Sequence, residues 1–99
     1  MPELTTSKMF FIYVLSSAKD QHHYIGYTDN LKRRLEEHNK GLNQSTKPRI
    51  PLKLIYLEGC LNQIDVKRRE RYLKTTQGRR FLGLRLKEYQ HALAFGIRG

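Results

Sequence analysis

The most hydrophobic segment of the chain is the unbroken apolar run from Met9 to Leu15, which is rich in aromatic and β-branched residues. Such a run is typical of a strand that is buried on both faces at the centre of a sheet. A second run, Tyr24 to Tyr27, is expected to pair with it as a β-hairpin. With Tyr13 opposite Tyr24, residues 17–20 make a turn of common length, and the two phenols lie side by side.

The polar and apolar positions after the hairpin predict a helix over Leu31 to Lys40. Residues 28–30 offer side-chain oxygens as an N-terminal cap, and Gly41 lies where a helix commonly ends in a left-handed residue. Residues 43–51 are polar and contain two prolines, which indicates a loop. Residues 52–57 then predict a third strand, and its lysine at the second position favours a place at the sheet edge.

Two further helices are predicted in the C-terminal half. Asn62 is a cap for a helix that runs to about Thr76, and Gly78 is the expected stop. Apolar residues at helical spacing indicate a third helix whose stripe closes the core: Leu82, Leu86, Tyr89 and Leu93. The pattern therefore predicts an α/β fold, a small three-stranded, mostly antiparallel sheet flanked by three or more helices.

A chain of 99 residues has room for one domain with a single modest core. We therefore treat residues 1–99 as one domain, with a main module at about residues 10–86 and a short C-terminal helical tail at residues 87–99. No apolar run is long enough for a membrane span, and residues 1–5 lack the layout of a signal peptide. We expect a cytoplasmic protein with no membrane partner.

The charge of the chain points to a polyanion partner. Nineteen Lys and Arg residues against nine Asp and Glu residues give a net charge of +10. Such an excess is typical of proteins that bind nucleic acid, so we expect DNA as the partner, although charge does not separate DNA from RNA.

Polar side chains occupy positions on the predicted helices that face the core. Arg34 and His38 fall on the apolar stripe of the first helix, and Glu70 falls on that of the second. An ionised group buried without a partner costs several kcal/mol, so such groups are normally paired or open to a cleft. One interpretation is a structural ion pair between Arg34 and Glu70. The other is a cleft whose side chains suit phosphodiester cleavage, lined by Tyr13, Tyr24, Arg34, His38 and Glu70.

These residues carry a resemblance to a known family. The chain resembles a GIY-YIG nuclease domain of the short stand-alone bacterial type, similar to the catalytic module of the excision-repair endonuclease subunit. The matching positions are Phe11-Ile12-Tyr13, Tyr24-Ile25-Gly26, Arg34, His38, and Glu70 within Arg68-Arg69-Glu70-Arg71. Phe11 stands where the family name has glycine, and the asparagine that several members carry beyond the glutamate is absent.

The resemblance implies a metal-dependent endonuclease that hydrolyses phosphodiester bonds in DNA, with structure-selective cleavage and a role in repair or recombination as further expectations. It implies one divalent ion, Mg²⁺ or Mn²⁺, with Glu70 as its ligand, and Arg34 as the residue that holds the phosphate. It leaves open whether Tyr13 or Tyr24 is the general base. We favour Tyr13, with His38 as the next candidate for proton transfer.

Basic side chains are dense over residues 67–87, which we expect to form a face that binds the nucleic-acid backbone. The side chains expected to bind it are Lys47, Arg49, Arg68, Arg71, Lys74, Arg79 and Arg80. A second hypothesis is a nucleic-acid-binding module that cleaves weakly or not at all. The chain shows no separate target-recognition domain, so selectivity would come from DNA shape or from a protein partner.

Overall fold

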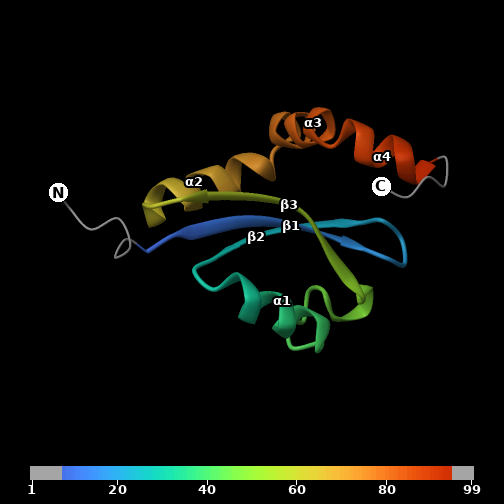
Figure 1. Cartoon of the computed structure of the whole chain (residues 1–99), viewed down its shortest axis with the longest axis horizontal. Coiled ribbons are helices and arrows are strands. Elements are labelled where there is room, and N and C mark those ends of the chain that lie inside the picture. The colour runs from blue at the N-terminus through green and yellow to red at the C-terminus, as the bar shows by residue number, and fades with distance from the viewer. Residues whose placement is uncertain (1–7, 95–99) are drawn as a thin grey trace.

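The computed structural model describes residues 8–94. Its elements are β1 (Phe10–Ser17), β2 (His23–Thr28), α1 (Leu31–Asn39), a 3₁₀ helix (Lys47–Arg49), β3 (Leu52–Cys60), α2 (Gln63–Leu73), α3 (Thr76–Arg85) and α4 (Lys87–Ala94). The strands of this part of the chain form one antiparallel sheet in the order β2-β1-β3 (Figure 1). The expected fold class is confirmed. Residues 1–5 and the last part of the predicted C-terminal tail lie outside the described residues.

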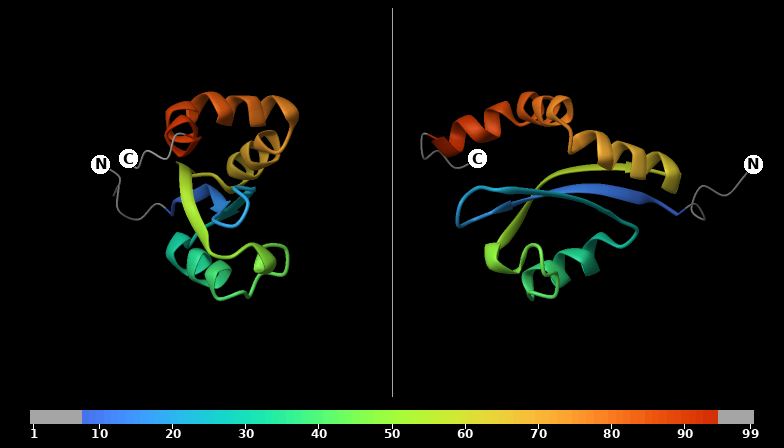
Figure 2. Two further views of the ribbon diagram at one scale, coloured as in Figure 1. Left: turned by 90° about the vertical axis from the view of Figure 1, so that its right-hand side faces the viewer. Right: turned by 180° about the vertical axis from the view of Figure 1, so that it is seen from behind.

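Strand β1 is central, and its alternating side chains are buried on both sides of the sheet. Ile12 and Val14 pack in the cluster that contains the apolar side chains of α2 and α3. Tyr13 and Leu15 pack in a second cluster, with apolar side chains of α1 and β3. The sheet therefore lies between α1 on one face and the layer of α2, α3 and α4 on the other (Figure 2).

Helix α1 is fixed at both ends by the residues that the sequence indicated. The Asn30 side chain accepts a hydrogen bond from the Arg33 N–H at 3.1 Å, and Gly41 has a φ of +77° just beyond the helix. The Asn39 amide also binds the backbone of Leu52 twice, at 2.8 and 3.0 Å. Because β3 begins at Leu52, this contact holds α1 against the edge strand that the lysine in segment 52–57 predicted.

The register of the hairpin differs from the predicted one. Tyr13 is paired with Gly26, and Tyr24 is opposite Leu15, so the pairing that we expected between the two tyrosines is wrong. The turn is shifted because Gln21 adopts a left-handed φ of 61° and the Asp20 side chain accepts a hydrogen bond from the backbone N–H of His22. A shift of two residues keeps each side chain on its face, so both phenols still lie on the α1 side of the sheet.

Helix α2 ends at Leu73, earlier than predicted, and Gly78 is not its stop. Instead Thr75 caps α3, and its hydroxyl accepts a hydrogen bond from the Gly78 N–H at 3.1 Å. A Cβ atom on Gly78 would collide with the carbonyl oxygen of Tyr72. The glycine is thus required by the close approach of two helices rather than by a left-handed cap.

The predicted third helix is two helices, α3 and α4, which meet at Leu86. Leu82 and Leu86 are buried, whereas Leu93 is 44% exposed, so the apolar stripe closes the core only through α3. Within residues 8–94 no helix has the length and apolar character needed to cross a membrane.

The helix junction gives a stability prediction. Gly78→Ala should lower the free energy of unfolding by about 1–3 kcal/mol, because its methyl group has no space beside the α2 backbone. Gly83→Ala, also in α3, is the matched control, since a Cβ there meets no atom within 4 Å and alanine favours a helix by up to about 1 kcal/mol. Urea unfolding followed by circular dichroism measures both, and equal midpoints for the two variants would contradict the packing.

Candidate active site

A polar cavity of about 360 Å³ lies beside the edge strand β2 and is lined from both faces of the sheet. Tyr13 of β1, Tyr24 of β2, Arg34 of α1 and Glu70 of α2 all contribute to its lining. Helices α1 and α2 cover opposite faces of the sheet (Figure 1), and side chains of both reach this edge to line the cavity. Four of the five predicted site residues are thus brought into one cavity.

Gly26 determines where the Tyr13 phenol lies. The two residues are paired across β1 and β2, and a Cβ on Gly26 would lie 2.5 Å from the Tyr13 Oη. Real Cβ atoms do not approach a neighbouring atom so closely. The missing side chain therefore lets the phenol extend across β2 toward the cavity, which gives the glycine of the Tyr24-Ile25-Gly26 motif a steric purpose.

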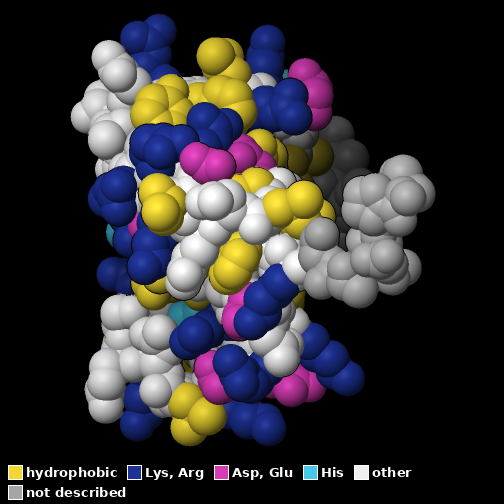
Figure 3. Space-filling view, turned by 90° about the vertical axis from the view of Figure 1, so that its left-hand side faces the viewer, with side chains coloured by type: hydrophobic (Ala, Val, Ile, Leu, Met, Phe, Trp, Pro, Cys, Tyr) yellow, Lys and Arg dark blue, Asp and Glu magenta, His cyan; other side chains and the backbone are white. Residues whose placement is uncertain are grey.

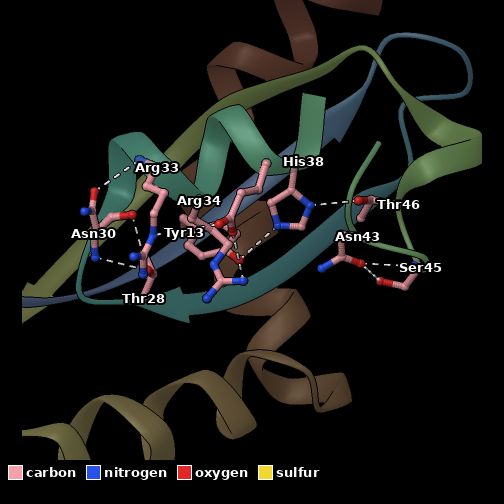
Figure 4. Close-up of polar contacts among 10 residues, drawn as sticks. Tyr13, Thr28, Asn30, Arg33, Arg34, His38, Asn43, Ser45 and Thr46 are labelled. Atoms are coloured by element: carbon pink, nitrogen blue, oxygen red, sulfur yellow. Dashed lines mark hydrogen bonds and ion pairs between the residues drawn. The ribbon is translucent and has the colours of Figure 1, made fainter. Parts of the chain in front are cut away.

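His38 does not line the cavity, contrary to our expectation of a five-residue cleft. Its side chain is fully buried behind Tyr13, and its Nε2 lies 3.1 Å from the Tyr13 Oη. Its Nδ1 lies 2.7 Å from the hydroxyl of Thr46, which is also fully buried (Figure 4). The rings of both tyrosines pack edge-on against the imidazole, with centroid distances of 5.8 Å for Tyr13 and 5.1 Å for Tyr24.

The two buried titratable groups are both held in their neutral forms. Burial raises the pKa of the Tyr13 phenol, the neighbouring Tyr24 and Glu70 raise it further, and Arg34 opposes them. Burial also lowers the pKa of His38, with a contribution from Arg34, whereas Glu37 opposes the shift. At neutral pH the site therefore contains a protonated phenol hydrogen-bonded to an uncharged imidazole.

Arg34 and Glu70 do not form the structural ion pair that was our alternative interpretation. Among the described residues, the partner of Arg34 is Glu37, at 3.4 Å, and the partner of Glu70 is Lys74, at 2.6 Å. The Nε of Arg34 is buried and has no hydrogen-bond partner. A buried donor without an acceptor is costly, so the guanidinium is suited to receive an anion.

Two carboxylates line the cavity. Asp29 is 38% exposed and pairs with Lys8 at 2.9 Å, and the more buried one, which suits a divalent ion, is Glu70. Its side chain is 13% exposed, and carboxylate oxygens are preferred by Mg²⁺, which commonly takes one or two protein carboxylates and completes its shell with water and phosphate oxygens. Within residues 8–94 no group of three or more His, Cys, Asp and Glu side chains is placed to hold a metal. The donor set therefore fits a hard ion shared with a phosphate.

The basic residues of the stretch 67–87 do not form one face. Lys67 lies over the Tyr27 ring of β2 at 5.9 Å, and Lys74 pairs with Glu70 in the cavity. Burial lowers the pKa of His23, the first residue of β2, and the nearby Arg79 lowers it further. Arg79 therefore also lies on the β2 side. We call Lys67, Lys74 and Arg79 the β2-side cations. Figure 3 shows Lys and Arg side chains following one side of the molecule from top to bottom.

Two other basic residues of this stretch, Arg68 and Arg69, have acidic partners away from the cavity. Arg69 donates two hydrogen bonds of 2.9 Å to Glu58 of β3, and Arg68 pairs with Asp65 on the outer surface of α2. Arg71 and Arg80 are exposed, and their part in binding stays a prediction. Arg68 therefore points away from the cavity with Asp65 as its partner, and its part in binding also stays a prediction.

Of the two cations predicted in the loop, Arg49 lies near the other end of the sheet. Arg49 pairs with Asp20 of the hairpin turn at 2.7 Å, and its carbonyl accepts a hydrogen bond from Ser17, the last residue of β1. The cavity instead includes Phe10, the first residue of β1. Arg49 is thus paired within the protein. The Lys47 side chain lies beside Gly41 instead, and the Lys47 N–H donates to the carbonyl of Asn43, which lines the cavity, so its part in binding stays a prediction.

Comparison with known proteins is consistent with this geometry. The model of the GIY-YIG catalytic domain matches residues 9–83. A UPF0213 protein of Clostridium perfringens is 39% identical over 67 residues, which cover 67% of this chain and 71% of the relative. A UPF0213 protein of Pediococcus pentosaceus is 51% identical over 57 residues, which cover 57% and 59% of the two chains.

A third UPF0213 protein, from Oceanobacillus iheyensis, is 35% identical over 81 residues, which cover 81% of this chain and 91% of the relative. No solved structure matches the chain significantly. The names of these relatives state no substrate and no activity.

The position of Gly26 leads to a prediction. Gly26→Ala should displace the Tyr13 phenol and lower the free energy of unfolding by about 1–3 kcal/mol, because the new methyl group would overlap the phenol. The Tyr13 ring resonances should move in NMR spectra, and urea unfolding gives the stability. Gly83→Ala serves again as the control. Unchanged Tyr13 resonances together with an unchanged midpoint would show that the phenol does not lie over Gly26.

Proposed function

Because the chain belongs to the GIY-YIG family, as its motifs predicted, we propose that it is an endonuclease that hydrolyses phosphodiester bonds in DNA with a divalent ion, Mg²⁺ or Mn²⁺. The observation that carries the proposal is the convergence of Tyr13, Tyr24, Arg34 and Glu70 on one cavity. These side chains come from four elements and both faces of the sheet. A fold that only binds nucleic acid has no need of a carboxylate beside the phosphate.

Arg34 is the residue that we assign to the scissile phosphate. Its guanidinium lines the cavity, and its buried Nε has no partner in the protein. A planar guanidinium gives two parallel hydrogen bonds to phosphate oxygens, so a bound phosphate would satisfy the free donor. The interaction also stabilises the negative charge that develops as the phosphate is attacked.

Glu70 is the residue that we assign to the divalent ion. When bound there, the ion would neutralise charge on the phosphate and on the leaving oxygen. In the described structure Lys74 holds the Glu70 carboxylate through an ion pair of 2.6 Å across one helical turn. Lys74 orients this carboxylate toward the cavity and adds positive charge where a phosphate would bind.

Tyr13 and Tyr24 would orient the attacking water. The raised pKa of Tyr13 means that its phenol carries a proton at neutral pH, so Tyr13 acts as a base only if it passes that proton to a neighbour. His38 is the group in hydrogen-bond contact with this phenol. Tyr24 is more exposed and lies closer to the cavity mouth, so we assign to it a hydrogen bond to the phosphate or to the water.

The β2-side cations would bind the backbone of the substrate beside the cavity. Selectivity would come from DNA shape, from single-stranded character or from a protein partner. Cleavage of branched or flapped DNA, in repair or recombination in the cytoplasm, is the role that we propose on this basis. RNA as substrate is an outcome that the same assay detects.

A nucleic-acid-binding module without cleavage is the second candidate. One observation favours it: the Glu70 carboxylate is already paired with Lys74. If that ion pair persists in the presence of metal ions, the protein would bind DNA and not cut it.

The nuclease assignment is tested by cleavage of branched, flapped, single-stranded and plain duplex DNA with Mg²⁺ or Mn²⁺. Glu70→Gln and Tyr13→Phe should each lower the rate by about 100-fold or more and leave binding at low salt within a few-fold. Glu36→Gln and Tyr72→Phe, both exposed, are the matched controls and should cut normally. Metal-independent cutting, or equal cutting by Glu70→Gln, would exclude the proposed site.

The binding surface is tested by a pair of adjacent charges on α2. Lys67→Ala should weaken DNA binding and reduce the slope of log K against log salt by about 0.9, the loss of one phosphate contact. Arg68→Ala removes the same charge from the outer surface of the helix, where Asp65 is its partner, and should change the slope little. Equal effects of both substitutions in fluorescence anisotropy would show that the β2-side cations are not the binding surface.

A further inference from the structure

Thr46 is the one buried polar residue of the loop between α1 and β3. The Asn43 side chain organises this loop by accepting hydrogen bonds from the Ser45 N–H at 3.0 Å and the Ser45 hydroxyl at 2.6 Å. The Asn43 carbonyl accepts another from the Thr46 N–H at 3.2 Å. Thr46 is thereby turned away from solvent and toward His38.

Thr46 and Tyr13 lie at opposite nitrogens of the same imidazole (Figure 4). In a neutral imidazole one nitrogen carries a proton and donates, while the other accepts. If Nδ1–H donates to the Thr46 hydroxyl, Nε2 has a free lone pair for the Tyr13 O–H. If Nε2 carried the proton instead, it would point at the phenol oxygen and Tyr13 would have no acceptor there.

We propose that Thr46 is a positioning residue, which holds His38 in the Nδ1–H tautomer so that Nε2 accepts the proton of Tyr13 during cleavage. The proton-transfer step of this inference rests on the proposed function. The tautomer of His38 does not depend on that function. The contact is fully buried, so water does not compete with Thr46 for Nδ1–H.

The proton movements balance. As the water oxygen forms its bond to phosphorus, one water proton moves to the Tyr13 oxygen, and the phenolic proton moves to His38 Nε2. The bond from phosphorus to the leaving oxygen breaks, and that oxygen takes a proton from solvent. His38 then returns its extra proton to the Tyr13 oxygen, which releases the proton taken from the water into the solvent of the cavity that Tyr13 lines, and each residue regains its starting form. While His38 is an imidazolium, Nδ1–H still donates to Thr46, so the same contact serves both states.

Other groups around His38 modulate this transfer. Tyr13 and Tyr24 face the ring from β1 and β2, Arg34 and Glu37 act on it from α1, and Thr46 faces it from the loop. Arg34 disfavours the imidazolium and Glu37 favours it. A phosphate bound by Arg34 would offset the cation and so make His38 a better proton acceptor when substrate is present.

The test begins with the ¹⁵N shifts of the His38 ring in the wild-type protein. They should show Nδ1–H and an unprotonated Nε2, and the opposite tautomer would overturn the proposal without any variant. Thr46→Val keeps the shape of the side chain and removes the hydroxyl, so the tautomer should move toward Nε2–H. Thr46→Ser keeps the hydroxyl and should retain the wild-type tautomer.

Cleavage is measured on the same three proteins. Thr46→Val should cut about 10-fold to 100-fold more slowly, part of the 10²–10⁴ that proton transfer contributes, whereas Thr46→Ser should stay within a few-fold of wild type. In Thr46→Val the acid limb of the pH profile should move to lower pH, because the His38 imidazolium loses the hydroxyl that accepts from Nδ1–H and the pKa of His38 falls. Wild-type rate, profile and tautomer in Thr46→Val would overturn the proposal. Absence of cleavage in the wild type would overturn the proposed function, while the ring shifts would still decide the role of Thr46.

Discussion

The site depends on the burial of one phenol. Tyr13 is 2% exposed, and its oxygen has room because Gly26 has no side chain. The buried oxygen is satisfied by a hydrogen bond with His38. Burial gives the phenol a fixed position and at the same time raises its pKa, so the group is well placed but holds its proton firmly. A buried phenol of this kind becomes a useful base only through a neighbour that takes its proton, and the contact with His38 meets this need.

A second constraint is the position of the cavity at the sheet edge. Although α1 and α2 cover opposite faces, Arg34 and Glu70 come together beside β2, where no further strand separates them. Arg34 then lies with an unsatisfied donor, and within residues 8–94 the ion-pair partner of Glu70 is Lys74. The edge strand thus allows a guanidinium and a carboxylate from different layers to line one cavity, as the proposed phosphate site requires.

Much of this arrangement was predictable from the sequence. The apolar run of β1, the caps of α1 and the ordered motif residues predicted the sheet, the first helix and four residues of the cavity, because these signals are local. The hairpin register was wrong because a left-handed Gln21 shifts the turn, and no local pattern specified that conformation. Gly78 was misread as a helix stop because a side chain is excluded there by the backbone of α2, which the local sequence does not show.

The same distinction explains what was missed in the site. Thr46 reads as an ordinary loop residue, and only the folded structure brings its hydroxyl to His38. The basic stretch on α2 and α3 seemed uniform, yet helical geometry directs Lys67 toward the β2 edge of the sheet and Arg69 toward Glu58 at the β3 edge. Charge density was therefore a poor guide to the individual contacts.

The central claim is that the cavity beside β2 is the place where a divalent ion and a phosphate meet. Paramagnetic broadening of backbone amide resonances by Mn²⁺, in the presence of a short DNA fragment, tests it most directly. The account predicts broadening centred on Glu70 and on the neighbouring residues Tyr13 and Gly26, and its loss in Glu70→Gln. Broadening centred elsewhere, or equal broadening in the variant, would contradict it.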